Sequence, residues 1–307
     1  MRLLSRDGAP DGRTWLKTKT RMRWPRLAAG PTVFLLPAVT IQLLLFAAPL
    51  VIVVAYSFLT RGPYGGTSLP FTLENYARLW DPLYARILLR SIALAALATL
   101  LCLVLGLPLA VYISRSGSRK GLLLQLVMLP FWTSFLIRTY AWIFLLRDTG
   151  WINHLLIRWG WISSPLPLLY HDGAVVLGLV YGYLPFMVLP LFATLERLDR
   201  RFVEAAADLG APPWRVFWEV TLPLCRPGVW AGSILVFIPC LGAYLTPDLL
   251  GGGKSIMVGN LVQNQFTSAR DWPFGAALSL ALMVLSLILL VAVRRAVGRA
   301  GGLEDPW

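Results

Sequence analysis

The sequence predicts an all-α, polytopic membrane protein with six transmembrane helices. Of its 307 residues, 57% are hydrophobic and only 14% are charged, whereas soluble domains carry about 25% charged residues. Six continuous apolar runs are close to or above the roughly 20 residues that a helix needs to cross a bilayer. These runs lack the alternating pattern of a membrane β-barrel. We therefore expect a helical membrane domain over residues 31–296.

The six expected spans define the order of the elements along the chain. They cover residues 31–58, 91–113, 122–146, 173–195, 228–245 and 274–293. Between the first two, a glycine-rich turn is expected to open an outer loop, and a short surface helix is expected over residues 73–89.

Basic residues orient these spans. Most of the 28 Lys and Arg residues lie before the first span, in alternate loops and after the sixth span. Basic residues in short loops stay on the cytoplasmic side. We therefore expect a basic cytoplasmic N-terminal tail at residues 1–30, which lies against membrane lipids, and a cytoplasmic C-terminal tail at residues 297–307. This arrangement accounts for the net charge of +13 without a nucleic-acid partner.

Prolines mark the central spans. Pro130 lies in the third span, and Pro185 and Pro190 lie in the fourth. Proline removes a helical hydrogen bond and clashes with the preceding turn, so we expect kinked or broken helices there. Lipid cannot satisfy the freed carbonyl groups, and spans three to five are therefore expected to line a pathway. The alternative is that prolines are simply more frequent in membrane helices.

The cytoplasmic loop at residues 197–227 predicts two short helices. Asp199 suits the cap of the first helix, and Gly210 suits the left-handed residue that ends it. Pro212 and Pro213 then suit the first turn of the second helix, which Pro223 is expected to end. Apolar residues share one face of each helix; these are Phe202, Ala205, Ala206 and Leu209 in the first and Trp214, Phe217, Trp218 and Thr221 in the second. The alternative is an amphipathic loop that lies on the membrane.

The spacing within this loop resembles the EAA loop of binding-protein-dependent ABC importer permeases. The residues that match are Glu204, Ala205, Ala206, Gly210, Val220, Leu222 and Pro223. The resemblance implies the type I ABC importer permease fold and a loop that docks on a cytoplasmic ATPase. In this interpretation, the two alanines allow close approach and Gly210 sets the angle between the helices. Glu204 supplies a polar contact or an internal cap.

Further segments are similar to the spermidine/putrescine permease family, from about residue 70 to the end of the sixth span. They include Pro130–Thr133, Leu136–Tyr140, Gly178–Tyr181, Asp248–Gly252 and Arg270–Ala277. The resemblance implies a bacterial inner-membrane permease that works with a dimer of ABC ATPases and with a second, homologous permease. It also implies a periplasmic or lipid-anchored solute-binding protein. ATP and Mg²⁺ are then used by the ATPase, and this chain binds no cofactor.

A polyamine pathway requires carboxylates and aromatic faces, because ammonium groups are attracted to both. Asp248 is the better carboxylate candidate, whereas Asp271 suits the cap of the sixth span. An interfacial acid without a role is the alternative for Asp248. The candidate aromatic residues are Trp132, Tyr140, Tyr181, Tyr183 and Tyr244. The alternative for each of them is packing or anchoring at the membrane interface.

Arg138 lies inside the third span, where a charge is costly. We expect it to pair with an acid or with helix carbonyls and to brace the pathway. It would also suit an anion transporter, so a permease for another small solute remains an alternative. A self-sufficient secondary transporter is less favoured, because the spans show neither an internal repeat nor other charges.

The sequence gives little support for an enzyme or for a metal-binding site. Gly251–Ser255 resembles the end of a phosphate-binding loop, but Asp248 occupies the position of its first glycine. Ser, His and acidic residues are scattered over both sides of the membrane, so we expect no catalytic residues. Three dispersed cysteines and two histidines predict no metal site.

Overall fold

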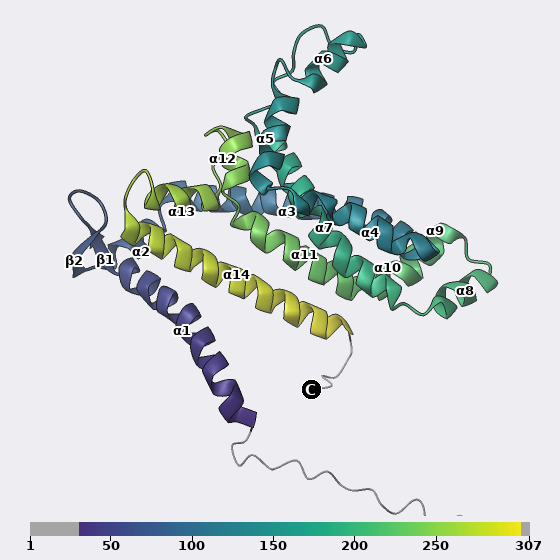
Figure 1. Cartoon of the computed structure of the whole chain (residues 1–307), viewed down its shortest axis with the longest axis horizontal. Coiled ribbons are helices and arrows are strands. Elements are labelled where there is room, and N and C mark those ends of the chain that lie inside the picture. The colour runs from purple at the N-terminus through teal and green to yellow at the C-terminus, as the bar shows by residue number, and fades with distance from the viewer. Residues whose placement is uncertain (1–30, 302–307) are drawn as a thin grey trace, which may run out of the picture. The chain divides into compact units, whose positions relative to one another are not determined.

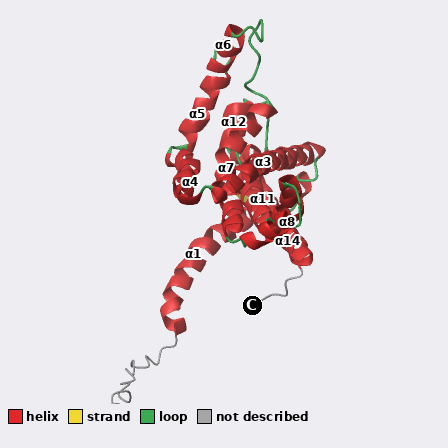
Figure 2. Ribbon diagram, turned by 90° about the vertical axis from the view of Figure 1, so that its right-hand side faces the viewer, coloured by secondary structure: helices red, strands yellow, loops and turns green. Residues whose placement is uncertain are grey.

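The computed structural model describes residues 31–301, and most of this part of the chain is helical (Figure 2). The first helix, α1 (Pro31–Ser57), contains Pro37 and Pro49. The chain divides within α1, between Val51 and Ile52, into two compact units, and the second unit contains all the other elements. The expected N-terminal tail at residues 1–30 lies outside the described residues.

A small outer segment follows α1. Strands β1 (Leu59–Arg61) and β2 (Thr67–Phe71) pair antiparallel and lead to α2 (Glu74–Arg78) and α3 (Pro82–Arg115). The single surface helix expected over residues 73–89 is therefore wrong, and α3 begins well before residue 91. The cause is local: the Asp81 carboxylate accepts a hydrogen bond from the Leu83 amide at 2.8 Å, and Pro82 suits the first turn.

The third span is broken, as the proline predicts. Its elements are η1 (Gly117–Arg119), α4 (Lys120–Met128), η2 (Leu129–Trp132), α5 (Phe135–Leu146) and α6 (Trp151–Arg158). The two halves meet at an angle of 87° at the break after Trp132. Residues 122–146 are thus not one straight helix.

In contrast, α7 (Asp172–Glu196) runs without interruption through Pro185 and Pro190, so the expected break is absent. Much of α7 is buried between neighbouring helices, which hold it as one helix despite the missing hydrogen bonds.

The remaining elements form the loop at residues 197–227 and the last two expected spans. They are α8 (Arg200–Asp208), α9 (Pro213–Val216), η3 (Phe217–Thr221), α10 (Leu222–Leu224), α11 (Arg226–Leu241), α12 (Leu245–Gly251), α13 (Val258–Phe266) and α14 (Trp272–Gly301). The expected span 228–245 is interrupted, because α11 ends at Leu241. Residues 297–301 of the expected C-terminal tail belong to α14, and residues 302–307 lie outside the described part.

The core lies where α3, α7 and α11 run side by side (Figure 1). Small residues allow these backbones to approach closely, as is usual between membrane helices. A Cβ atom at Gly232 of α11 would lie 2.7 Å from Met187 Sδ, and one at Gly228 would lie 2.9 Å from the Pro190 carbonyl oxygen. On α3, Ala95, Ala98 and Cys102 are fully buried, and the Cys102 thiol donates to the Val180 carbonyl of α7 at 3.7 Å.

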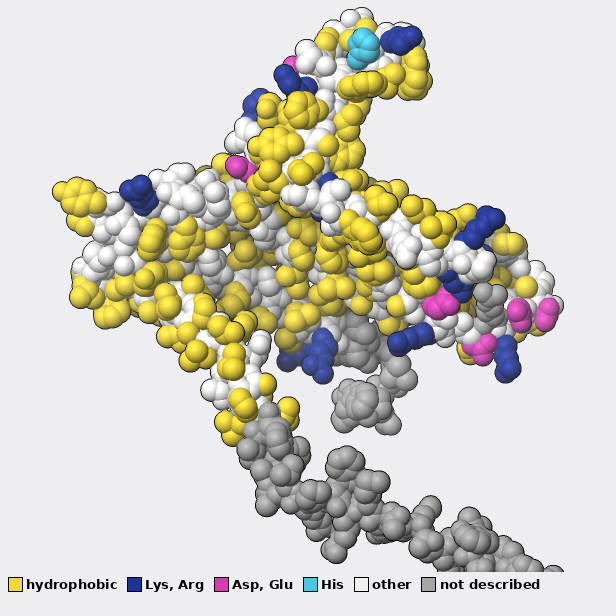
Figure 3. Space-filling view, in the orientation of Figure 1, with side chains coloured by type: hydrophobic (Ala, Val, Ile, Leu, Met, Phe, Trp, Pro, Cys, Tyr) yellow, Lys and Arg dark blue, Asp and Glu magenta, His cyan; other side chains and the backbone are white. Residues whose placement is uncertain are grey.

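Four described helices, α1, α3, α7 and α14, are long and apolar enough to cross a membrane. Two bent pairs raise this number to six when each pair counts as one span. The second bent pair joins residues 213–224 to α11 at 67°. Figure 3 shows hydrophobic side chains over the long helices, whereas charged side chains gather where α8 lies.

Candidate coupling loop and translocation residues

The loop at residues 197–227 begins with a well-capped helix. The Asp199 carboxylate accepts a hydrogen bond from the Arg201 amide at 3.0 Å, which confirms the expected cap of α8. Gly210 has φ +80° and nothing within 4 Å of the position of a Cβ atom. The Gly210 amide donates to the Ala207 carbonyl at 2.9 Å. The left-handed end of the helix is therefore confirmed, and it sets the direction in which α9 leaves.

The second helix differs from the expectation at its end. Pro212 and Pro213 start α9 as predicted, but Pro223 does not end the run. Instead, residues Phe217–Thr221 form a π-helical turn, and the helix continues to Leu224. A proline ring clashes with the carbonyl four residues earlier and lacks a donor, and a wider π-turn accommodates such a defect.

Apolar side chains of this loop face outward. Phe202 is 58% exposed and Leu209 is 89% exposed on α8, while Trp214 and Trp218 are 67% and 61% exposed on the second helix. Thr221 was expected on the same face as the tryptophans, but it is buried. The loop thus presents an unusually apolar surface, which we call the knob surface and define by Phe202, Leu209, Trp214 and Trp218. Exposed apolar patches of this kind mark sites of protein contact.

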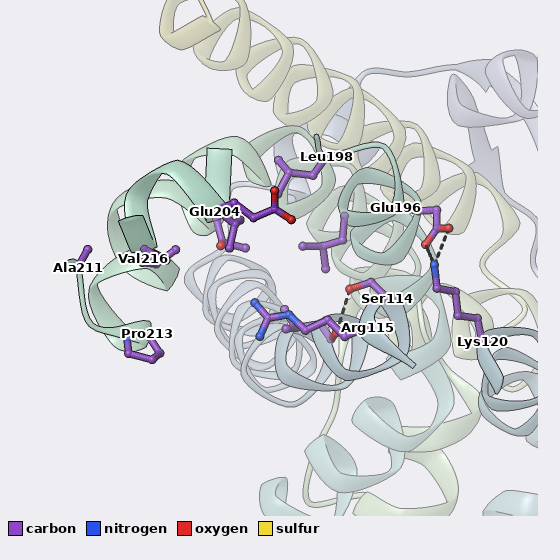
Figure 4. A pocket seen from close by; sticks show the side chains of 14 residues that line it. Ser114, Arg115, Lys120, Glu196, Leu198, Glu204, Ala211, Pro213 and Val216 are labelled. Atoms are coloured by element: carbon purple, nitrogen blue, oxygen red, sulfur yellow. Dashed lines mark hydrogen bonds and ion pairs between the residues drawn. The ribbon is translucent and has the colours of Figure 1, made fainter. Parts of the chain in front are cut away.

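Behind the knob surface lies a cavity of about 460 Å³ between the loop and the ends of α3 and α7. Arg115 and Glu204 both line it, and Figure 4 shows them on opposite walls. Beside them Lys120 Nζ donates to the Glu196 carboxylate at 2.8 Å, which links α4 to α7. The hydroxyl of Thr221, also at this cavity, is buried without a hydrogen-bond partner in the described residues.

The residues of the EAA pattern do not all lie on one surface. Ala205 and Glu204 are exposed, whereas Ala206, Val220, Leu222 and Pro223 are half-buried. The Glu204 carboxylate lines the cavity, and the polar contact or internal cap suggested for it stays a prediction. Its position at the cavity leaves it available for a contact.

Away from this loop, Asp248 and Tyr140 lie in one hollow, which we call the outer hollow after the orientation expected from the sequence. This hollow measures about 580 Å³, and Tyr170 and Lys254 also line it. The Asp248 side chain is exposed and makes no hydrogen bond or ion pair with the described residues. A carboxylate beside two aromatic rings suits an organic ammonium group, although Lys254 opposes it.

Tyr170 was missed by the sequence reasoning, because nothing in its sequence surroundings marks it. Its φ of +63° is rare for a residue with a side chain. Its amide donates to the Leu250 carbonyl at 2.9 Å, and its ring packs against Gly252. The backbone thus fixes the ring at the mouth of the hollow.

The other aromatic candidates do not join this hollow. Tyr244 lines a separate one of about 490 Å³ with Gln263, Ser279 and Ser286. Tyr181 contacts the Trp142 ring edge to face at 5.5 Å, Tyr183 packs near Phe186, and Trp132 is 88% exposed. The five aromatic candidates therefore lie in separate places, and the role of each in a pathway stays a prediction.

The other outer carboxylates serve structural contacts. Asp172 accepts hydrogen bonds from Arg90 at 2.6 Å and from Ser255, which fastens the loop after α12 to α3 and α7. Ser255, the last residue of the segment that resembles the end of a phosphate-binding loop, therefore makes a structural contact.

Asp271 is buried and makes two contacts. It pairs with Arg78 at 2.9 Å and accepts from the Phe274 amide at 3.2 Å, so the cap expected at α14 is confirmed. Burial lowers the pKa of Arg78, but the hydrogen bond and charge of Asp271, together with a smaller contribution from Tyr84, outweigh this effect and raise that pKa above its ordinary value.

Arg138 has neither of its expected partners. Its Nε and Nη1 atoms are buried without a hydrogen bond to any described residue. Instead, its Cζ atom lies 5.2 Å from the centre of the Phe131 ring and 5.5 Å from that of Phe135. The described residues also contain no group of three or more His, Cys, Asp or Glu side chains that would hold a metal ion.

Comparison with known proteins gives consistent matches. The family model of the binding-protein-dependent transport system inner membrane component matches residues 102–299. The spermidine/putrescine transport system permease protein PotB of Salmonella typhimurium (strain LT2) is 44% identical over 245 residues, which cover 79% of this chain and 85% of that protein. PotB of Haemophilus influenzae is 44% identical over 249 residues, which cover 81% and 87%.

A solved structure shares the fold. It is that of a bacterial ABC transporter involved in the import of the acidic polysaccharide alginate, with a TM-score of 0.73 and 16% sequence identity. The match covers 87% of this chain and 94% of the other chain.

Proposed function

Because this chain belongs to the family of binding-protein-dependent transport system inner membrane components, we propose that it is a permease subunit of an ATP-driven importer of polyamines. The 44% identity to proteins named spermidine/putrescine permeases, over most of both chains, is the observation that carries this proposal. In it, the chain lies in the bacterial inner membrane with both termini in the cytoplasm.

The importer contains further subunits. A second, homologous permease encloses the pathway with this chain, and two ABC ATPases bind on the cytoplasmic side. A periplasmic or lipid-anchored binding protein delivers the cargo. ATP and Mg²⁺ are bound and used by the ATPases, so this chain needs no cofactor of its own.

Coupling runs through the knob surface. Phe202 and Leu209 of α8 enter a groove on the ATPase, where their exposed apolar area is removed from water. Closure of the ATPase dimer moves this loop, and the helix that links it to α11 carries the movement into the membrane. The loop can shift the balance between two transporter states only through contacts that differ between them.

Cargo meets the pathway at the outer hollow. There the Asp248 carboxylate attracts one ammonium group, and the rings of Tyr140 and Tyr170 contribute cation–π attraction. Lys254 limits how strongly a cation is held, which favours onward movement over retention.

Uptake of labelled putrescine and spermidine by cells that express the whole transporter tests the proposal. We expect saturable uptake with the wild-type chain and none with Gly210→Asp, which places a charge beside the knob surface. Gly210→Asn is the matched control, because asparagine has nearly the same shape and tolerates the left-handed conformation. It should retain most of the uptake.

The possible results separate the parts of the proposal. If an assembled wild-type transporter takes up no polyamine, this result contradicts the proposed cargo. The assignment as an importer of another solute would then still stand. Unchanged uptake in Gly210→Asp would contradict coupling through the loop and favour a self-sufficient transporter.

A further inference from the structure

The Arg138 side chain is the strongest anomaly in the membrane-spanning part of the described chain. Arginine carries five N–H donors and stays charged at all relevant pH values. Two of its nitrogen atoms, Nε and Nη1, are buried and lack an acceptor. A charge inside a membrane span without hydrogen bonds is strongly unfavourable, and Nη2, which is not among the buried atoms, is the Arg138 nitrogen open to an acceptor from outside the described residues.

The surroundings of Arg138 show why the chain cannot supply that acceptor itself. The guanidinium lies by Phe131, before the break, and Phe135, after it. Phe131 packs edge to face on Phe186 of α7 at 5.0 Å, and Phe135 packs against Gly182. Rings therefore cover the side of the arginine that faces the core.

The neighbouring residues of the same segment face outward. Trp132 is 88% exposed, Ile137 is 65% exposed and Leu136 is 45% exposed. Arg138 thus lies at the edge of an apolar surface around the elbow between η2 and α5. A surface of this kind within a membrane protein faces either lipid or another subunit.

Lipid is a poor partner at this position. Eight residues separate Arg138 from the outer end of α5, or about 12 Å of helix, and hydrocarbon tails carry no hydrogen-bond acceptors. A polyamine is equally unsuitable, because both groups are positively charged. Charged residues in membrane spans usually pair with each other.

We infer that Arg138 forms an intersubunit ion pair with a carboxylate on the second permease, across a contact centred on the elbow of the third span. This inference rests on the proposed function, which supplies the second permease. The pair also neutralises a charge that would otherwise repel a cationic cargo. The planar guanidinium can stack on the two rings and present its free edge to a carboxylate at the same time.

Carbodiimide cross-linking of the intact transporter tests this inference. In Arg138→Lys, a primary amine stands where the guanidinium was, and a membrane-permeant carbodiimide joins an amine to a carboxylate only when the two are in contact. We expect a covalent product of the two permeases, which mass spectrometry locates at residue 138 and at one acid of the second permease. Arg147→Lys is the matched control, because Arg147 is exposed at the end of the same helix, and it should give no such product.

A negative result is equally specific. Absence of the product at residue 138, in a preparation that contains both permeases and the ATPase, would overturn the inference but leave the proposed function intact. If the wild-type chain purifies from the cells with neither a second permease nor an ATPase bound, that result would instead contradict the proposed function.

A charge exchange gives a second test that does not depend on the lysine variant. Arg138→Glu should lower uptake about tenfold or more, because the new carboxylate then faces the carboxylate of the second permease. Replacement of the partnering acid of the second permease by arginine should restore uptake. Each intramembrane acid of that subunit can be replaced by arginine in turn. If none of these replacements restores uptake in Arg138→Glu, the inference is also overturned.

Discussion

Within α12, the Asp248 carboxylate shares a hollow with the rings of Tyr140 and Tyr170. Two other acids on this side, Asp172 and Asp271, are occupied by arginine partners. Asp248 lines the hollow and has no such partner among the described residues, so it is available to a cation.

Asp248→Asn should slow maximal polyamine uptake about fivefold, since the loss of one partly solvated cation contact costs roughly 1 kcal/mol. The maximal rate is the relevant quantity, because the binding protein sets the apparent affinity of the whole importer. Asp148→Asn removes an exposed carboxylate that does not line this hollow and should leave the rate unchanged. Equal rates in both variants would exclude Asp248 from the pathway.

Single residues were predictable from the sequence where their role is local. Asp199 and Gly210 follow from rules on helix ends, and those rules need only a few neighbouring residues. The surroundings of Arg138 and the placement of Tyr170 depend on segments far apart in the chain. No local pattern specifies them.

At the scale of the elements, α7 and α11 approach through glycines. A Cβ atom at Gly228 would lie 2.6 Å from Thr194 Oγ1 and 2.9 Å from the Pro190 carbonyl oxygen. Because one of these atoms belongs to the backbone, the contact cannot relax by a change of rotamer alone.

Gly228→Val should therefore destabilise the permease by about 1–3 kcal/mol, as overpacked cores commonly do. Thermal unfolding of the purified protein in detergent measures this change. Gly121→Val is the matched control, because nothing lies within 4 Å of a Cβ atom at that position. Equal unfolding temperatures for the two variants would contradict the close packing of α7 on α11.

The sequence was less informative about how helices end and break. Pro130 predicted the break in the third span, whereas Pro185 and Pro190, for which a kink or a break was expected, lie inside the continuous α7, so there is no break there. Proline weakens a helix in every case, whereas the packing around it decides whether the helix breaks. At Pro223 the outcome was a π-turn instead of an end.

For the whole molecule, the apolar runs predicted the membrane domain because burial in lipid depends on composition and length alone. The grouping of the candidate site residues was not predictable in this way. Tyr140 and Tyr244 line different hollows, and Tyr181 packs on Trp142, an arrangement that depends on tertiary packing. The outer hollow and the knob surface therefore lie at opposite ends of the helices and are linked mainly through α7 and α11 (Figure 1).

ATP hydrolysis by the complete transporter in liposomes, measured with and without polyamine-loaded binding protein, tests this link most directly. We predict that the loaded binding protein stimulates hydrolysis with the wild-type chain. Stimulation should disappear in Gly210→Asp and persist in Gly210→Asn, with all subunits still assembled. Full stimulation in Gly210→Asp would contradict the claim that the knob surface couples the ATPase to the membrane pathway.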